Sequence, residues 1–271
     1  MNSYSYSEEK NKEELEKIKT IAGEKEKDKN LLKQLYSFID LTSLSGKDNS
    51  QSIESLCNMA LQLPHKVAAV CVYPVFTRQV KSLLRNSGIR TAAVAGAFPS
   101  AQSPFTIRMA EVEWTLKEGA DEIDIVINRG EFLEGKTTEV FDEIKTIVDL
   151  SKDVPVKVIL ETGELESTEN IRKASQLAME AGASFLKTSS GKITPAATPE
   201  VAFVMCNSIL KFYQSTGKKI GFKAAGGIHT ASQAVLYYTI IEQILGSEWL
   251  NPQLFRIGAS QLVQTLLQSN V

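Results

Sequence analysis

The chain has 271 residues, of which 43% are hydrophobic and 23% are charged, a composition typical of globular proteins with a sizeable core. Thirty Lys and Arg residues nearly balance 32 Asp and Glu residues, so no broad cationic surface for nucleic acid or anionic lipid is expected. Three scattered cysteines are too few for a disulfide framework, and no apolar run approaches the ~18–20 residues of a membrane span. These features exclude disulfide-rich and membrane-spanning classes and favour a soluble, cytoplasmic protein.

The first thirty residues differ from the rest, because fifteen of them are Asp, Glu, Lys or Arg. Leu15, Ile18 and Ala22 recur at helical spacing, which predicts an amphipathic helix from about Glu8 to Gly23. The extreme N-terminus contains no apolar signal core. We expect residues 1–30 to form a charged extension, helical or partly disordered, and residues 31–271 to form one catalytic domain.

Short apolar or β-branched runs then alternate with longer helical stretches. The expected strands are Phe38–Leu41, Ala68–Val72, Thr91–Ala95, Glu122–Ile127, Val156–Leu160, Phe185–Thr188, Ile220–Ala224 and Phe255–Gly258. The expected helices are Asp48–Leu61, Val75–Asn86, Pro104–Glu118, Thr138–Lys152, Ser167–Ala181, Pro199–Ser215, Ala231–Leu245 and Gln261–Gln268. This regular alternation indicates parallel strands joined by helical crossovers.

Eight strand–helix units in ~250 residues match the size of a closed (β/α)8 barrel. A doubly wound open sheet would give the same alternation. However, no G-x-G-x-x-G motif follows the first expected strand, and the chain contains no Walker A motif. We therefore predict an α/β protein with a (β/α)8 TIM barrel and an extra N-terminal helical segment.

Charged residues inside the expected strands are the main indication of chemistry. In Glu122–Ile127 the isoleucines share one face, so Asp124 points to the barrel interior. Lys187 shares a face with Phe185, and Lys223 shares a face with Gly221, whose missing side chain leaves room. Two lysines and one carboxylate are thus expected to converge in one enclosed space.

Such a lysine has two interpretations. Burial and a neighbouring cation favour the neutral amine, which attacks carbonyl groups and forms a Schiff base, and the second lysine and the carboxylate can transfer protons. A buried Lys–Asp pair can also merely brace the barrel. A rival nucleophile, Lys157, also faces inward, but it lies near the start of its strand, where a paired structural role is expected.

Small-residue loops follow the last three expected strands, as barrel phosphate sites require. They are Thr188-Ser-Ser-Gly-Lys192, Ala224-Ala-Gly-Gly-Ile228 and Gly258-Ala-Ser-Gln261. No metal site is expected, because the two histidines, His65 and His229, stand apart from each other and from any ligand cluster. Cys71 could line the pocket, although we interpret it as a small buried apolar residue.

Seven segments, in order along residues 36–266, resemble the deoxyribose-phosphate aldolase family. They are Ile39-Asp-Leu-Thr42, Ala69-Val-Cys-Val-Tyr-Pro74, Gly119-Ala-Asp-Glu-Ile-Asp-Ile-Val-Ile-Asn128, Leu160-Glu-Thr-Gly-Glu-Leu165, Phe185-Leu-Lys-Thr-Ser-Ser-Gly-Lys192, Ile220-Gly-Phe-Lys-Ala-Ala-Gly-Gly-Ile228 and Phe255-Arg-Ile-Gly-Ala-Ser260. The resemblance implies a metal-free and cofactor-free class I aldolase on a (β/α)8 barrel. Its reaction is reversible cleavage of 2-deoxy-D-ribose 5-phosphate to D-glyceraldehyde 3-phosphate and acetaldehyde, and a homodimer is common in the family.

The resemblance also implies individual roles. Lys187 becomes the Schiff-base lysine, Lys223 the second lysine that lowers its pKa and takes part in proton transfer, and Asp124 the proton-relay aspartate. The implied phosphate contacts are Gly191, Lys192, Gly226, Gly227, Gly258 and Ser260. Asp40 and Cys71 match pocket positions of lesser role.

Three positions depart from the family pattern. His229 stands where an arginine is common, Gln261 where Ser or Thr is common, and Ala224 where a proline is usual. Two alternatives stay open. One is a Schiff-base aldolase for another sugar phosphate, and the other, motivated by His229 and Gln261, is a catalytically silent sugar-phosphate-binding protein.

Overall fold

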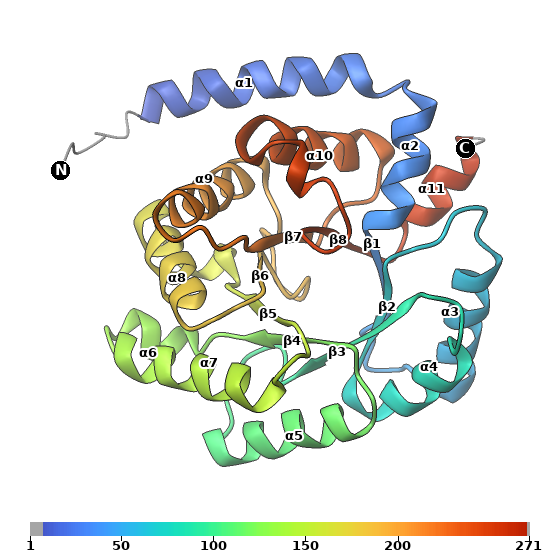
Figure 1. Cartoon of the computed structure of the whole chain (residues 1–271), viewed down its shortest axis with the longest axis vertical. Helices are drawn as coiled ribbons and strands as arrows, with labels where there is room; N and C mark the ends of the chain where they lie inside the picture. Colours follow the sequence, from blue (N-terminus) through green and yellow to red (C-terminus); the bar gives the residue numbers. More distant parts are fainter. Residues whose placement is uncertain (1–7, 270–271) are drawn as a thin grey trace.

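A computed structural model describes residues 8–269, so the first seven residues of the expected N-terminal extension and the last two residues of the chain lie outside it. Its eight strands are β1 Ile39–Thr42, β2 Ala69–Val72, β3 Arg90–Ala95, β4 Glu122–Val126, β5 Val156–Ile159, β6 Phe185–Lys187, β7 Gly221–Ala225 and β8 Phe255–Ala259. They form a closed parallel barrel in chain order, with β8 paired to β1. Figure 1 shows the strands as a ring enclosed by helices. The predicted (β/α)8 barrel is confirmed.

The helices follow the strands as expected. They are α1 Glu8–Lys25, α2 Lys29–Leu35, α3 Ser50–Gln62, α4 Thr77–Leu83, α5 Phe105–Lys117, α6 Arg129–Leu133, α7 Thr137–Ser151, α8 Thr168–Glu180, α9 Pro199–Thr216, α10 Ala231–Leu245 and α11 Leu262–Gln268. Short 3-10 helices occur at Tyr36–Phe38, Pro74–Phe76, Thr162–Glu164 and Ser247–Trp249. Two short helices, α2 and α6, were not predicted, because each is too short to show a periodic apolar pattern.

The N-terminal helix α1 lies along the outer side of the barrel, over α10 and α9 (Figure 1). Its apolar stripe, Leu15, Ile18 and Ala22, is buried, while the charged residues between them face outward. Lys25 at its last turn forms an ion pair with Glu242 of α10. The N-terminal helix predicted from this spacing is therefore packed against the outside of the barrel.

Side chains alternate along each strand between the core beneath the helices and the inside of the barrel. Outward-facing residues such as Ile123 and Ile125 join the large core beneath the helices. The inner face of the barrel holds a smaller apolar cluster at β2 and β3, which includes Cys71 and Val94. The remaining inner positions are largely occupied by charged side chains, and these form the site described below.

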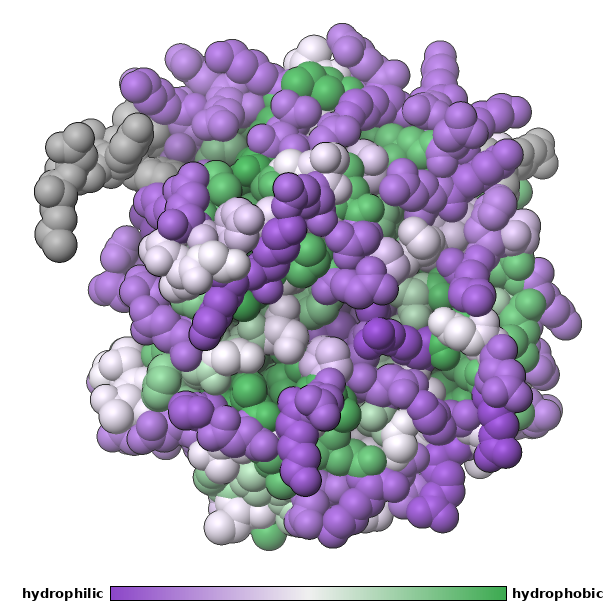
Figure 2. Space-filling view, in the orientation of Figure 1, coloured by the Kyte–Doolittle hydropathy of each residue, from purple (hydrophilic) through white to green (hydrophobic). Residues whose placement is uncertain are grey.

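The outer surface is largely polar. On the face drawn in Figure 2, hydrophilic residues dominate and hydrophobic ones lie in small separate groups. Among the helices of residues 8–269, none is long and apolar enough to cross a membrane.

Candidate active site

A pocket of about 430 Å³ opens at the carboxyl ends of the strands, between the loops that follow β1, β6, β7 and β8. Its lining includes every residue that the sequence assigned to phosphate, namely Gly191, Lys192, Gly226, Gly227, Gly258 and Ser260. Lys187 also lines it, whereas Lys157 and Lys223 do not. Because barrel enzymes carry their chemistry at this end, the pocket is the candidate active site.

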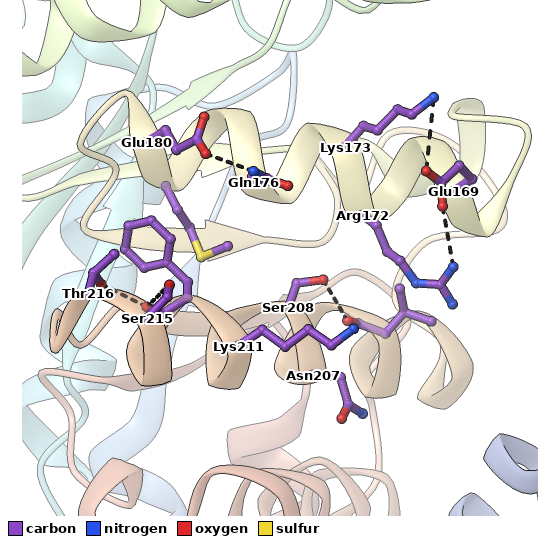
Figure 3. Close-up of a pocket in the computed structure, with 13 residues that line it drawn as sticks. Glu169, Arg172, Lys173, Gln176, Glu180, Asn207, Ser208, Lys211, Ser215 and Thr216 are labelled. Atoms are coloured by element: carbon purple, nitrogen blue, oxygen red, sulfur yellow. Dashed lines mark hydrogen bonds and ion pairs between the residues drawn. The ribbon is translucent and has the colours of Figure 1, made fainter. Parts of the chain in front are cut away.

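Two other hollows lie away from the barrel interior. Figure 3 shows a groove of about 540 Å³ between α8 and α9, where Arg172 and Lys173 contact Glu169, and Gln176 contacts Glu180. Its other polar side chains include Asn207, Ser208, Ser215 and Thr216, which bond to backbone carbonyls of α9, and no strand contributes to the lining. A shallow hollow of about 1030 Å³ lies at the amino ends of the strands, the end of a barrel that usually serves stability. Lys187 lines neither of these hollows.

Asp124, on β4, joins three lysines beneath the pocket. Its Oδ2 accepts hydrogen bonds from Nζ of Lys187 and Nζ of Lys223, both at 2.8 Å, and its Oδ1 accepts one from Nζ of Lys157, also at 2.8 Å. Parallel register explains the convergence, since Asp124 pairs with Lys157, and Lys187 pairs with Lys223, across neighbouring strands. The structure therefore brings the predicted trio together and places Lys157 inward and paired, as expected.

A second group of charges lies next to these lysines, centred on Arg256 of β8. Its guanidinium donates to Asp40 Oδ1 at 2.6 Å and to both carboxylate oxygens of Glu122, at 2.6 and 2.9 Å. Asp40 in turn accepts a hydrogen bond from Lys223, and Glu122 forms a 2.6 Å ion pair with Lys157. Asp40 is thus part of the charged cluster, and every carboxylate in the cluster contacts at least two cations.

The room for these side chains comes from two glycines. A Cβ at Gly221 would lie 2.4 Å from the ring of Phe185, so this glycine makes space for the phenyl ring and not, as the sequence indicated, for Lys223. The space beside Lys223 comes from Gly258, where a Cβ would lie 3.2 Å from the lysine Cε. The Phe185 ring in turn lies 5.9 Å from Nζ of Lys157, at the distance of a cation–π contact.

Burial and neighbouring charges separate the three lysines. Burial lowers the pKa of Lys187, the nearby charge of Lys223 lowers it further, and Asp124 only partly offsets both. Burial also disfavours the charged forms of Lys223 and Lys157, but the adjacent carboxylates outweigh it and raise the pKa of both. Burial opposes the ionised form of Asp124 too, yet its three lysine partners hold its pKa well below the usual range. Lys187 is therefore the amine of the cluster most ready to lose its proton.

The loops around the pocket are held close together by glycine. Gly226 has φ +88°, and a Cβ there would lie 2.6 Å from Cβ of Ala196 and 3.1 Å from Cα of Gly191. Lys192 follows Gly191, and its Nζ donates to the carbonyl oxygen of Leu44 in the loop after β1. Glycines that let the loop backbones lie close together, and one lysine at the rim, give this pocket the features of an anion-binding site.

The other candidate residues have ordinary surroundings. Cys71 is buried on the inner barrel face, and burial raises the pKa of its thiol. His229 is exposed at the pocket rim, where its backbone N–H donates to Gln233, and His65 lies 5.4 Å from the ring of Tyr36. Within residues 8–269, no group of three or more His, Cys, Asp or Glu side chains is arranged to hold a metal ion.

Three buried charged residues were missed by sequence reasoning: Glu122, Arg256 and Glu161. Glu122 has the same strand parity as Asp124, and Arg256 precedes the outward Ile257, so alternation alone could have placed both inward. Glu161, at the end of β5, accepts a hydrogen bond from the backbone N–H of Ser190, and its Oε2 has no partner. Glu161 has the same parity as Lys157, so alternation could have placed it inward too, although it lies beyond the end of β5 with a left-handed backbone, φ +51°.

Comparisons with known proteins agree with this geometry. The profile of the DeoC/LacD family of aldolases matches residues 35–244. The chain is 42% identical to human deoxyribose-phosphate aldolase over 251 residues (87% of this chain, 79% of the human protein). It is 43% identical to the bovine enzyme over 241 residues (83% and 76%). Among solved structures, the tetrameric deoxyribose phosphate aldolase from Aeropyrum pernix superposes with a TM-score of 0.71 at 28% identity, covering 89% of this chain and 93% of that one. This chain belongs to the DeoC/LacD family of aldolases.

Proposed function

We propose that the protein reversibly cleaves 2-deoxy-D-ribose 5-phosphate to D-glyceraldehyde 3-phosphate and acetaldehyde through a Schiff base on Lys187. One observation carries this assignment: Lys187 and Lys223 bind the same carboxylate oxygen of Asp124, directly below a pocket with the character of a phosphate site. Of these two lysines, only Lys187 lines that pocket. A protein that merely binds a sugar phosphate would not need an enclosed amine of lowered pKa.

The first step is attack of the neutral Lys187 amine on C1 of the open-chain sugar. The aldehyde oxygen takes up protons and leaves as water, so that the amine and the aldehyde become an iminium ion with net uptake of one proton. Lys223 is charged and shares Asp124 with the nucleophile, so this pair can supply the proton. The proton given up by this pair offsets the positive charge of the iminium, so the net charge of the cluster does not change.

Carbon–carbon cleavage follows. The Lys223–Asp124 pair, which has given up a proton, takes the proton of the C3 hydroxyl. The C2–C3 bond breaks, and the electron pair of that bond moves to the iminium to leave a neutral enamine on Lys187. D-Glyceraldehyde 3-phosphate departs with C3, C4 and C5. The enamine is then protonated at C2, and water attacks the new iminium, which releases acetaldehyde, the free amine and the proton taken up at the start.

The loops after β6, β7 and β8 hold the phosphate in this proposal. Gly191, Gly226 and Gly258 allow backbone N–H groups to approach an anion closely, and Lys192 adds a charge at the rim. The phosphate fixes the distance from the pocket rim to C1, so that C1 is presented to Lys187.

Borohydride reduction in the presence of substrate, followed by peptide mass analysis, tests the nucleophile. We expect a reduced adduct on Lys187 and turnover that Lys187→Met abolishes. An adduct on Lys157, or none, would overturn the assignment. Turnover with acetaldehyde as the donor in the synthetic direction separates this reaction from that of an aldolase for another sugar phosphate.

We also propose a cytoplasmic location and a homodimeric assembly. All three cysteines are free and buried, which suits a reducing compartment. Light scattering on the purified protein tests the assembly, and a monomeric mass would contradict it.

A further inference from the structure

The charges enclosed by the barrel balance only when one of its three buried lysines is neutral. Ion pairs connect seven buried side chains: the carboxylates Asp40, Glu122 and Asp124, and the cations Lys157, Lys187, Lys223 and Arg256. All seven are at most 3% exposed, so water screens them little. Three negative charges face three positive ones if Lys187 is deprotonated, and a fourth positive charge is uncompensated if it is protonated.

Apart from Arg90, no other charge is connected to this group by an ion pair in the described part of the chain. The elements around Lys187 contribute Asp40 from β1, Cys71 from β2, the uncharged Ala92 and Val94 from β3, Asp124 from β4, Lys157 from β5, Lys223 from β7 and Arg256 from β8. Arg90 reaches Glu122 at 3.2 Å from the amino end of the barrel, but its side chain is 43% exposed and solvated. Glu161 binds the backbone of Ser190 and forms none of these ion pairs.

We propose that Arg256 and Glu122, which do not line the pocket, are positioning residues that set the protonation of Lys187 through the charge balance of the cluster. Arg256 cannot release its proton, so it fixes one positive charge permanently and secures Asp40 and Glu122 as anions. Lys157 and Lys223 are each held between at least two carboxylates. Lys187 contacts only Asp124 among the three carboxylates, so it is the lysine of the cluster that is deprotonated.

This inference rests on Lys187 as the nucleophile of the proposed function, but its test does not require sugar-phosphate cleavage. The assay is reductive trapping of Lys187 by acetaldehyde and cyanoborohydride, quantified by peptide mass analysis across a pH series. The rate follows the neutral fraction of the amine, so the midpoint of its acid limb reports the protonation of Lys187 directly. Absence of any adduct on Lys187 in the unmodified protein would refute the proposed function, whereas the variants below test the charge balance.

The Arg256→Met variant removes a buried positive charge, and Lys187 then gains its proton more readily. We expect the midpoint to rise on the order of one pH unit, with a roughly tenfold lower trapping rate below it. Arg256→Lys keeps the charge and should keep the midpoint. The double variant Arg256→Met/Glu122→Gln removes one charge of each sign and should restore it.

A purely structural role gives a different pattern. It would lower the trapping rate at every pH without moving the midpoint, or it would give Arg256→Lys and Arg256→Met the same pH profile. It could also make trapping slower in the double variant Arg256→Met/Glu122→Gln than in Arg256→Met alone. Any of these results overturns the proposal. If Arg256→Met fails to fold because two buried carboxylates each lose one of their cations, Glu122→Gln alone decides. The charge balance then predicts a midpoint shifted to lower pH, and an unshifted midpoint contradicts it.

Discussion

Replacing Lys223 by leucine isolates the charge closest to the proposed nucleophile. Nζ of Lys223 and Nζ of Lys187 both lie 2.8 Å from Oδ2 of Asp124, so the two nitrogens are at most about 5.6 Å apart. Two positive charges at that distance repel by about 3 kcal/mol at an effective dielectric constant of ~20, which corresponds to about two units of pKa. Lys223→Leu should therefore raise the pKa of Lys187 by about two units.

The fold should tolerate this change. Asp124 keeps Lys187 and Lys157 as partners, and Asp40 keeps Arg256. Reductive trapping with acetaldehyde, followed across a pH series, measures the effect without involving the phosphate loops. A variant of the outer Lys219, which pairs with Glu248, serves as the control, and Lys219→Met should leave the pH profile unchanged.

The expected result is specific in its pH dependence. Trapping of Lys187 in the Lys223→Leu variant should be about a hundredfold slower at pH values below the pKa of the unmodified protein, and the two proteins should converge at high pH. A uniform loss at every pH, with the midpoint in place, would refute the electrostatic role of Lys223. It would leave this lysine a role in geometry or proton transfer only.

Three further predictions concern the loops and the buried carboxylates. Gly226→Ala should destabilise the fold by about 1–3 kcal/mol in thermal unfolding and raise KM for the phosphorylated substrate, because the new Cβ would lie 2.6 Å from Cβ of Ala196. Gly46→Ala, where a Cβ has no atom within 4 Å, is the control, and equal effects of the two substitutions would contradict this reason. His229→Arg should lower KM roughly three- to tenfold with little change in kcat, since a permanent guanidinium at the rim strengthens phosphate binding, and an unchanged KM would count against a phosphate at this rim. The pKa of Asp124 is lowered on folding, so its ionised form stabilises the fold at pH values above its unfolded pKa of ~3.9. As the pH falls below that value, the free energy of unfolding should decrease by about 1.4 kcal/mol per pH unit. Urea unfolding from pH 6 to pH 3 should show this decrease, and the Asp124→Asn variant should show a smaller one.

Much of the barrel could be predicted because it depends on local patterns. Short β-branched runs between amphipathic stretches placed all eight strands within one residue of their observed ends. Period-two alternation also placed Asp124, Lys187 and Lys223 inside, since that geometry depends only on strand parity. The family resemblance selected Lys187 over the other lysines, a choice that alternation alone left open.

What could not be predicted depends on contacts across the barrel. The partner of Gly221 is the Phe185 ring one strand away, and no local pattern identifies which side chain fills that space. Arg256 meets Glu122 and Asp40 only because the sheet closes on itself and brings β8 beside β1. The docking of α1 on α10 likewise joins segments more than 200 residues apart. Tertiary closure, and not local sequence, assembles the charge cluster.

NMR titration of the lysines measures the protonation of Lys187 and its neighbours in the folded protein directly. With 13C-labelled lysine and the Lys187, Lys157 and Lys223 signals assigned by single substitutions, the Cε shift of each can be followed against pH. We expect Lys187 to titrate below the ordinary lysine range while Lys157 and Lys223 remain charged throughout. A Lys187 signal that titrates like a solvent-exposed lysine, or a neutral Lys223 beside a charged Lys187, would contradict this expectation.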